Sequence, residues 1–228
     1  MNDPCYFSAN TFRFLDELKA NNSREWFNNN KDRYEEHIKA PTLKFIKDFA
    51  GPLKKISNKY SAIAKINGGS MFRIYRDTRF SRDKTPYKTW IAARFNHVEA
   101  AKTPAPGFYM HLARGDVVMA AGIWHPPSPA LGRIRQFIAN NPQNWKSIVG
   151  SDTLKGFDFH GESLKRAPQG FDPEHELIDH IKRKDFALFR RYDERLACSP
   201  DFMPSFVRDC NKVAPFVDYL CAALGLDF

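Results

Sequence analysis

Residues 107–124 read GFYMHLARGDVVMAAGIW, and this stretch decides the fold. Its two halves, 107–113 and 117–124, alternate in polarity with the period of two that is typical of β-strands. The Gly115-Asp116 pair between them is typical of a tight turn. The stretch therefore predicts an antiparallel β-hairpin.

The register of this hairpin follows from its turn. If Gly115-Asp116 forms a two-residue turn, Arg114 pairs with Val117. Because both strands then place apolar residues on the same face, we expect that face to pack on the core. The apolar pairs are Leu112–Met119, Met110–Ala121 and Phe108–Ile123, and the pairs of the other, mixed face are Tyr109–Gly122, His111–Ala120 and Ala113–Val118.

A third strand is predicted just before the hairpin, at about 89–96. It alternates between a core face of Ile91, Ala93 and Phe95 and a mixed face of Trp90, Ala92, Arg94 and Asn96. Helical periodicity appears on both sides of these strands. Helices are predicted within 8–56, 128–140 and 206–224, and further short strands at 157–159 and 185–189.

These elements predict an α+β fold with a central, mostly antiparallel sheet flanked by N-terminal, middle and C-terminal helices. Asn22 is expected to cap the second helix, and Pro41 is expected to interrupt it. We expect a single domain over residues 1–228. Its parts are a helical part at about 8–56, a sheet-rich part at about 71–125 and a mixed helical part at about 128–226.

The composition favours a soluble protein with anionic partners. The chain carries 35 Lys and Arg against 26 Asp and Glu, a formal charge of +9, which favours nucleic acid, phosphorylated metabolites or acidic surfaces. No apolar run approaches the roughly 18 residues of a membrane span, and the first residues lack the pattern of a signal peptide. The four cysteines show no CxxC spacing, so we expect buried free thiols and a reducing, cytoplasmic setting.

Several stretches resemble one known family. Residues 72–89, FRIYRDTRFSRDKTPYKT, are similar to the signature of domain of unknown function 2461. The resemblance implies an α+β fold in one domain, and it assigns no catalytic residue because that family is uncharacterised. Ala120-Ala121 departs from the glycine expected there, which puts close backbone approach at that point in doubt. Four further stretches fit in the same order along the chain, at 21–34, 107–109, 122–126 and 164–171.

The charged segment 73–88 is the strongest candidate for a site. Six Arg and Lys against two Asp give it a charge of 6 − 2 = +4, and aromatic residues between them must lie against the body. Arg side chains offer planar forks that match phosphate or carboxylate, and the Asp residues would orient them or act as a base or metal ligand. The candidate ligand-binding residues of this segment are Arg76, Asp77, Arg79, Asp83, Lys84, Tyr87 and Lys88.

The mixed face of the sheet adds Arg94, Tyr109 and His111 as candidates. They would stand around the small side chains of Ala120 and Gly122, which leaves room for a planar or anionic ligand. The alternative is a helix packed on this face, with the tyrosine and histidine in internal hydrogen bonds. The histidines of the chain lack the spacing of metal ligands, so no metal site is predicted, and no cofactor can be named.

Three functions remain open. The first is a basic pocket for a small anionic ligand, which leaves undecided whether the protein is an enzyme. The second, less favoured, is nucleic-acid binding, for which the chain has charge and aromatic residues but no known motif. The third is a structural or interaction module whose Arg/Asp cluster is an ion-pair network. No membrane partner is expected.

Overall fold

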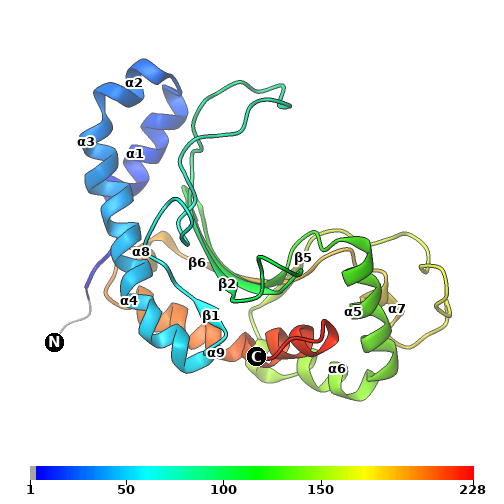
Figure 1. Cartoon of the computed structure of the whole chain (residues 1–228). Coiled ribbons are helices and arrows are strands. Elements are labelled where there is room, and N and C mark those ends of the chain that lie inside the picture. The colour runs from blue at the N-terminus through cyan, green and yellow to red at the C-terminus, as the bar shows by residue number, and fades with distance from the viewer. Residues whose placement is uncertain (1–3) are drawn as a thin grey trace.

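The structure, a computed structural model, describes residues 4–228. A strongly curved sheet forms its centre, and two long helices, α4 (Ala40–Ile56) and α9 (Phe202–Ala223), pack on the convex face (Figure 1). The concave face lies open between a helical arm, made of α1 to α3, and the part of the chain that carries α5 (Ser128–Asn140). Among residues 4–228, none of the helices combines the length and the hydropathy that crossing a membrane would need.

The sheet of the described residues has the strand order β1-β2-β3-β4-β6-β5. Each neighbouring pair in that order is antiparallel. The prediction of an α+β fold with a mostly antiparallel central sheet is therefore confirmed. The strands are β1 (Tyr60–Ser61), β2 (Ile91–His97), β3 (Gly107–Ala113), β4 (Asp116–Ile123), β5 (Asp158–His160) and β6 (Phe186–Tyr192).

The hairpin of β3 and β4 has the predicted faces but a different register. Ala113 pairs with Asp116, so the turn consists of Arg114 and Gly115. Gly115 has a φ of +72°, a left-handed conformation that favours glycine, and Asp116 already belongs to the strand. The predicted pairing of Arg114 with Val117 is wrong by two residues. A shift of two returns every side chain to the same face, so the core face is unchanged.

The first helices form the arm and lead into α4. Ser23, not Asn22, caps α2, because the Ser23 hydroxyl accepts the N–H of Trp26 at 3.2 Å. Pro41 does not interrupt the helical course: a π-helical turn, η1, precedes it, and Pro41 falls in the first turn of α4, where proline is tolerated. The other helices are α1 (Ala9–Ala20), α2 (Arg24–Asn29), α3 (Lys31–Tyr34), η1 (Glu35–Lys39), α6 (Pro142–Val149), η2 (Asp152–Leu154), α7 (Ile178–Ile181) and α8 (Glu194–Ala197).

The core lies between the convex face of the sheet and the two long helices. Phe49 of α4 packs on Phe95 of β2 with 4.7 Å between ring centroids, and on Phe206 of α9 with 5.1 Å. Ile91 and Ala93 are buried beside Phe95, as their alternation predicts. Because the two long helices cover the convex side, the concave face of the sheet is left to line a cavity.

The four cysteines are free thiols. Cys210 and Cys221 are buried in α9, and Cys198 is half-buried. Cys5 is exposed at the surface, where its thiol donates to the carbonyl oxygen of Cys198 at 2.8 Å. The prediction of buried thiols is therefore wrong for Cys5.

The charged segment 73–88 projects beside the helical arm as an irregular loop with two limbs (Figure 1). The limbs meet at a bridge between Tyr75 and Tyr87. Asn22 fixes the second limb to the arm, because its side-chain amide donates to the Tyr87 carbonyl and accepts from the Tyr87 N–H, both at 3.0 Å. The Tyr87 ring also stacks on Phe27 with 4.1 Å between centroids. The base of the loop is thus firmly placed.

Asn22→Ala is expected to loosen this loop. The change removes both hydrogen bonds to Tyr87, at a cost of about 1–2 kcal/mol, so the backbone amides of 74–88 should exchange faster with deuterium. Asn21→Ala is the matched control, because the Asn21 amide donates only to Glu17 of its own helix. Equal protection in Asn22→Ala and the wild type would show that the stack on Phe27 is enough to hold the loop.

Candidate functional site

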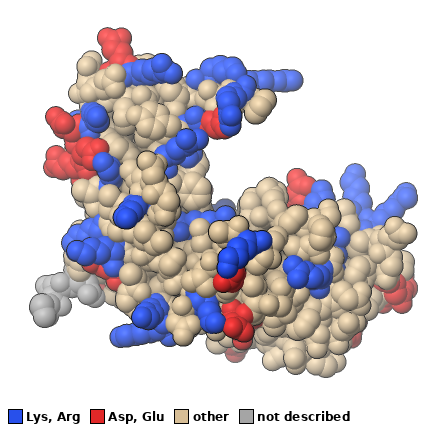
Figure 2. Space-filling model, in the orientation of Figure 1, with Lys and Arg blue, Asp and Glu red and all other residues tan. Residues whose placement is uncertain are grey.

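A cavity of about 420 Å³ opens on the concave face of the sheet. The concave side is visible in Figure 2 as the hollow between the two sides of the molecule, and Lys and Arg side chains lie on both sides. The volume falls within the roughly 300–1,000 Å³ of small-molecule sites. The lining residues are Phe72, Arg94, Gly107, Phe108, Tyr109, His111, Asp116, Val118, Ala120, Ala121, Gly122, Trp124, Ala187 and Phe189.

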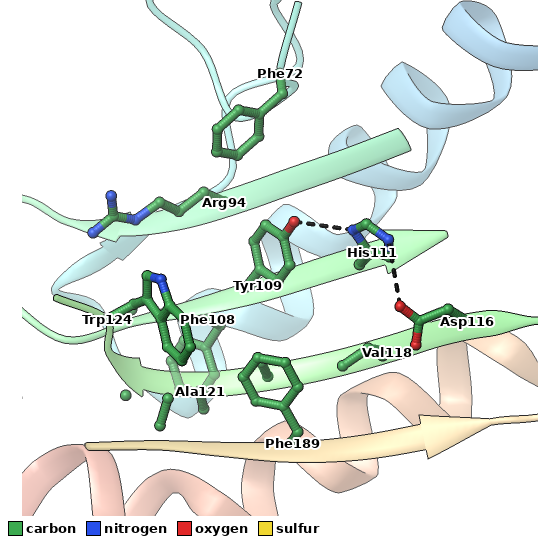
Figure 3. A pocket seen from close by; sticks show the side chains of 14 residues that line it. Phe72, Arg94, Phe108, Tyr109, His111, Asp116, Val118, Ala121, Trp124 and Phe189 are labelled. Atoms are coloured by element: carbon green, nitrogen blue, oxygen red, sulfur yellow. Dashed lines mark hydrogen bonds and ion pairs between the residues drawn. The ribbon is translucent and has the colours of Figure 1, made fainter. Parts of the chain in front are cut away.

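Small side chains form part of the floor of this cavity, and aromatic rings stand over it. Ala120, Gly122 and Ala187 come from the neighbouring strands β4 and β6. Trp124 and Phe189 rise beside them with 6.1 Å between ring centroids (Figure 3). A floor of this kind admits a flat, apolar group beside the rings.

Arg94 lies at the rim of the cavity on β2, where it pairs with Tyr109 of β3 (Figure 3). Its side chain is exposed, and no acidic side chain within residues 4–228 pairs with it. Other arginines of the predicted site, Arg76 and Arg79, do have Asp partners. An unpaired guanidinium beside an apolar floor is suited to bind a phosphate or carboxylate group.

Tyr109, His111 and Asp116 form a polar row along the cavity (Figure 3). The Tyr109 hydroxyl lies 3.1 Å from His111 Nδ1, and His111 Nε2 lies 3.8 Å from Asp116 Oδ2. With its proton on Nε2, facing the carboxylate, His111 accepts the Tyr109 hydroxyl at Nδ1. Burial raises the pKa of Tyr109 to about 12, so the side chain remains a phenol at neutral pH. Tyr109 and His111 therefore present neutral hydrogen-bonding groups to the cavity, and Asp116 adds a carboxylate at the end of the row.

His111 is expected to titrate below its ordinary pKa of 6.5. Burial lowers the pKa of His111, and the Asp116 carboxylate opposes the shift. The unfolded chain then binds the proton more readily, so the contribution of His111 to stability is present above pH 6.5 and is lost as pH falls through the lower folded pKa. Proton NMR of the imidazole would measure the midpoint, and Asp116→Asn should lower it further. A wild-type midpoint above 6.5 would contradict the shift.

Residues 10–219 match a family model described as "Conserved hypothetical protein (DUF2461)". The chain belongs to this family. The resemblance seen in residues 72–89 is thereby confirmed. No curated protein and no solved structure matches the chain.

The predicted site residues of this DUF2461 protein fall into two groups. Arg94, Tyr109 and His111 line the cavity, whereas none of the seven from the charged segment does. Lys88 lies beside the rings at the base of the loop: its ammonium is 5.0 Å from the centroid of Trp90, and burial lowers its pKa. The structure therefore brings the sheet residues together and leaves most of the loop apart from them.

The charges of the loop pair with each other. Arg79 contacts Asp77 at 2.7 Å, Arg76 contacts Asp83, and Lys84 donates to a backbone carbonyl of the same loop at 2.9 Å. The Arg79 side chain lowers the pKa of Asp77 to about 2. The pKa of Asp83 is also lowered to about 2, first by a backbone N–H two residues on and then by Arg76. A ligand role for these residues remains a prediction.

Asp116, Trp124 and Phe189 line the cavity but lie outside the predicted set. Asp116 was assigned to the turn. The turn actually consists of residues 114 and 115, so Asp116 lies on β4 near His111. Trp124 ends the predicted strand 117–124 on the same face as Gly122, so the period of two would have found it. Among residues 4–228, no three His, Cys, Asp or Glu side chains gather as metal ligands would.

Proposed function

We propose that this DUF2461 protein binds a small ligand that combines a flat ring with a phosphate or carboxylate group. The unpaired guanidinium of Arg94 at the rim of the cavity carries the proposal. The anionic group would bind Arg94, and the ring would lie on the small floor residues beside Trp124 and Phe189. A cytoplasmic location, which the free thiols favour, belongs to the same proposal.

Arg94→Ala is expected to weaken ligand binding about 10- to 100-fold, because hydrogen bonds to a charged group contribute about 1.5–3 kcal/mol. The probes are phenyl phosphate, diphenyl phosphate, benzoate and nucleoside monophosphates, screened by thermal shift and titrated by calorimetry. Arg13→Ala is the matched control, because Arg13 is exposed on α1 and is not part of the cavity. A wild-type protein that binds none of these probes would overturn the proposal.

Arg79→Ala and Lys84→Ala test the charged loop separately. If these variants also lose affinity for the probes, the charged loop contributes to the ligand site. Unchanged affinity, with loss in Arg94→Ala, would limit the site to the sheet. Unchanged affinity together with a lower melting temperature would favour the alternative of an ion-pair network that only holds the loop in shape.

Nucleic-acid binding is the second candidate, and one observation favours it. Phe80 in the charged loop is 95% exposed, with the Arg79 guanidinium 5.8 Å from its ring centroid. An exposed ring among cations is suited to stack on an unpaired base. Affinity for single-stranded DNA or RNA should then fall steeply with salt and should weaken in Phe80→Ala. No mobility shift at low salt would dismiss this candidate.

A further inference from the structure

A second hollow, of about 380 Å³, adjoins the cavity on the concave face. It shares Arg94 and Trp124 with the first cavity, and its wall also contains His125 and residues 100–105. Arg94 therefore lies where the two hollows adjoin, and a group bound to it would border the second hollow, which His125 also lines. This histidine has no role in the ligand site described above.

Asp185 binds the backbone of His125 and lies beside its imidazole. The carboxylate is buried, with only 1% of its side chain exposed, and its Oδ1 accepts the backbone N–H of His125 at 2.7 Å. The same oxygen lies 3.0 Å from His125 Nδ1, while Oδ2 accepts the backbone N–H of Glu162 at 3.2 Å. The imidazole itself is 69% exposed. When the ring carries its proton on Nδ1, the nitrogen beside the carboxylate, the lone pair of Nε2 is free to accept a proton.

Two unusual backbone positions bring the carboxylate and the imidazole together. His125 has a φ of +50°, and no other residue of 4–228 except glycine has a positive φ. Gly161 has a φ of +107°, and a Cβ there would lie 2.5 Å from the Cβ of Asp185. Strained backbone of this kind persists where the surrounding structure enforces it, and it gathers at functional sites.

Two other histidines of the sheet, His97 and His111, are used differently. His97 bonds through both ring nitrogens, to the Asp227 carbonyl and to the Glu99 N–H, and so serves the fold. His111 also has both nitrogens engaged, by a tyrosine and an aspartate. By contrast, no side chain or backbone group of residues 4–228 hydrogen-bonds to Nε2 of His125. Among His97, His111 and His125, it is His125 that combines a ring nitrogen free to take a proton with a carboxylate 3.0 Å from the other nitrogen.

We propose that His125 and Asp185 are a general-base pair that hydrolyses a phosphodiester held at Arg94. This inference rests on the proposed function, because Arg94 must first bind the anion. One guanidinium matches the single negative charge of a diester, and the two adjoining hollows offer room for its two substituents. His125 would be the catalytic residue, and Asp185 would be a positioning residue.

The step balances without any other reactant. His125 Nε2 takes a proton from a water molecule as the water oxygen forms a bond to phosphorus. The bond from phosphorus to one ester oxygen breaks, and that oxygen leaves with its electron pair as an alkoxide or phenolate. The products are a phosphomonoester and the freed alcohol or phenol, and the imidazolium returns its proton to the leaving group or to solvent.

The test uses bis(p-nitrophenyl) phosphate as the substrate, with p-nitrophenolate release followed by its absorbance. Wild-type protein should hydrolyse it, and His125→Gly should lose about 100-fold or more of the rate, in line with general-base contributions of roughly 10²–10⁴. Glycine tolerates the φ of +50°, so this variant should fold at least as stably as the wild type. Added imidazole should restore part of the rate in His125→Gly only, which a purely structural role would not produce.

Binding of diphenyl phosphate separates the two proposals. If the wild type binds diphenyl phosphate through Arg94 but hydrolyses no diester, the general-base inference is overturned and the proposed function stands. If it binds none of the probes and hydrolyses no diester, both proposals are overturned. A rate unchanged in His125→Gly, or a lost rate that imidazole does not restore, would also refute the inference. Asp185→Asn should lower the rate while diphenyl phosphate still binds.

Discussion

Gly122→Ala is expected to cost at least about 3 kcal/mol of folding stability, because two effects act together. Gly122 has a φ of +123°, which side chains other than glycine rarely adopt. A Cβ at this position would also lie 2.0 Å from the carbonyl oxygen of Phe186 on β6. The clash is with backbone, so no side-chain rotation relieves it, and β4 would have to separate from β6 beside Trp124.

Gly132→Ala is the matched control. Gly132 lies within α5, has no positive φ, and a Cβ there meets nothing within 4 Å. Alanine should therefore stabilise the protein by about 0.5–1 kcal/mol. Urea unfolding of both variants gives the comparison, and a Gly122→Ala midpoint equal to that of the wild type would mean that the two strands can part without loss.

The alternation of polarity was enough to find the floor of the cavity, although the pairing inferred from the turn was wrong. Arg94, Tyr109 and His111 were assigned to the mixed face from periodicity alone, and they line the cavity. A register error of two residues does not move a side chain to the other face. Close backbone approach was doubted at Ala120-Ala121, and the structure shows it one residue later, at Gly122.

The remainder of the site depends on contacts that no local pattern contains. The charged loop has an irregular backbone, so composition could identify its charges but could not decide whether they face the cavity or one another. His125 and Asp185 lie 60 residues apart and meet only because β4 pairs with β6. A pairing of strands that are distant in sequence is set by tertiary packing rather than by turn chemistry.

Asp209→Ala is expected to destabilise the protein by about 3 kcal/mol, because it removes a buried carboxylate that a hydroxyl and two partly exposed cations contact. Asp209 is fully buried in α9, where it accepts the Tyr192 hydroxyl at 2.9 Å. Arg190 Nε lies 3.4 Å from the same carboxylate, and Lys212 Nζ lies 3.3 Å from its other oxygen. Alanine would leave the phenol without its acceptor, and the guanidinium without its counter-charge, between the helix and β6.

Asp218→Ala, an exposed position on the same helix, is the control and should change stability by less than about 0.5 kcal/mol. Asp209→Asn should fall between the two, because an amide oxygen still accepts from Tyr192 but carries no charge for Arg190. Since β6 also presents Phe189 to the cavity, ligand affinity should be measured alongside urea unfolding. Asp209→Ala protein as stable as the wild type would show that the cluster adds no net stability, as some buried ion pairs do not.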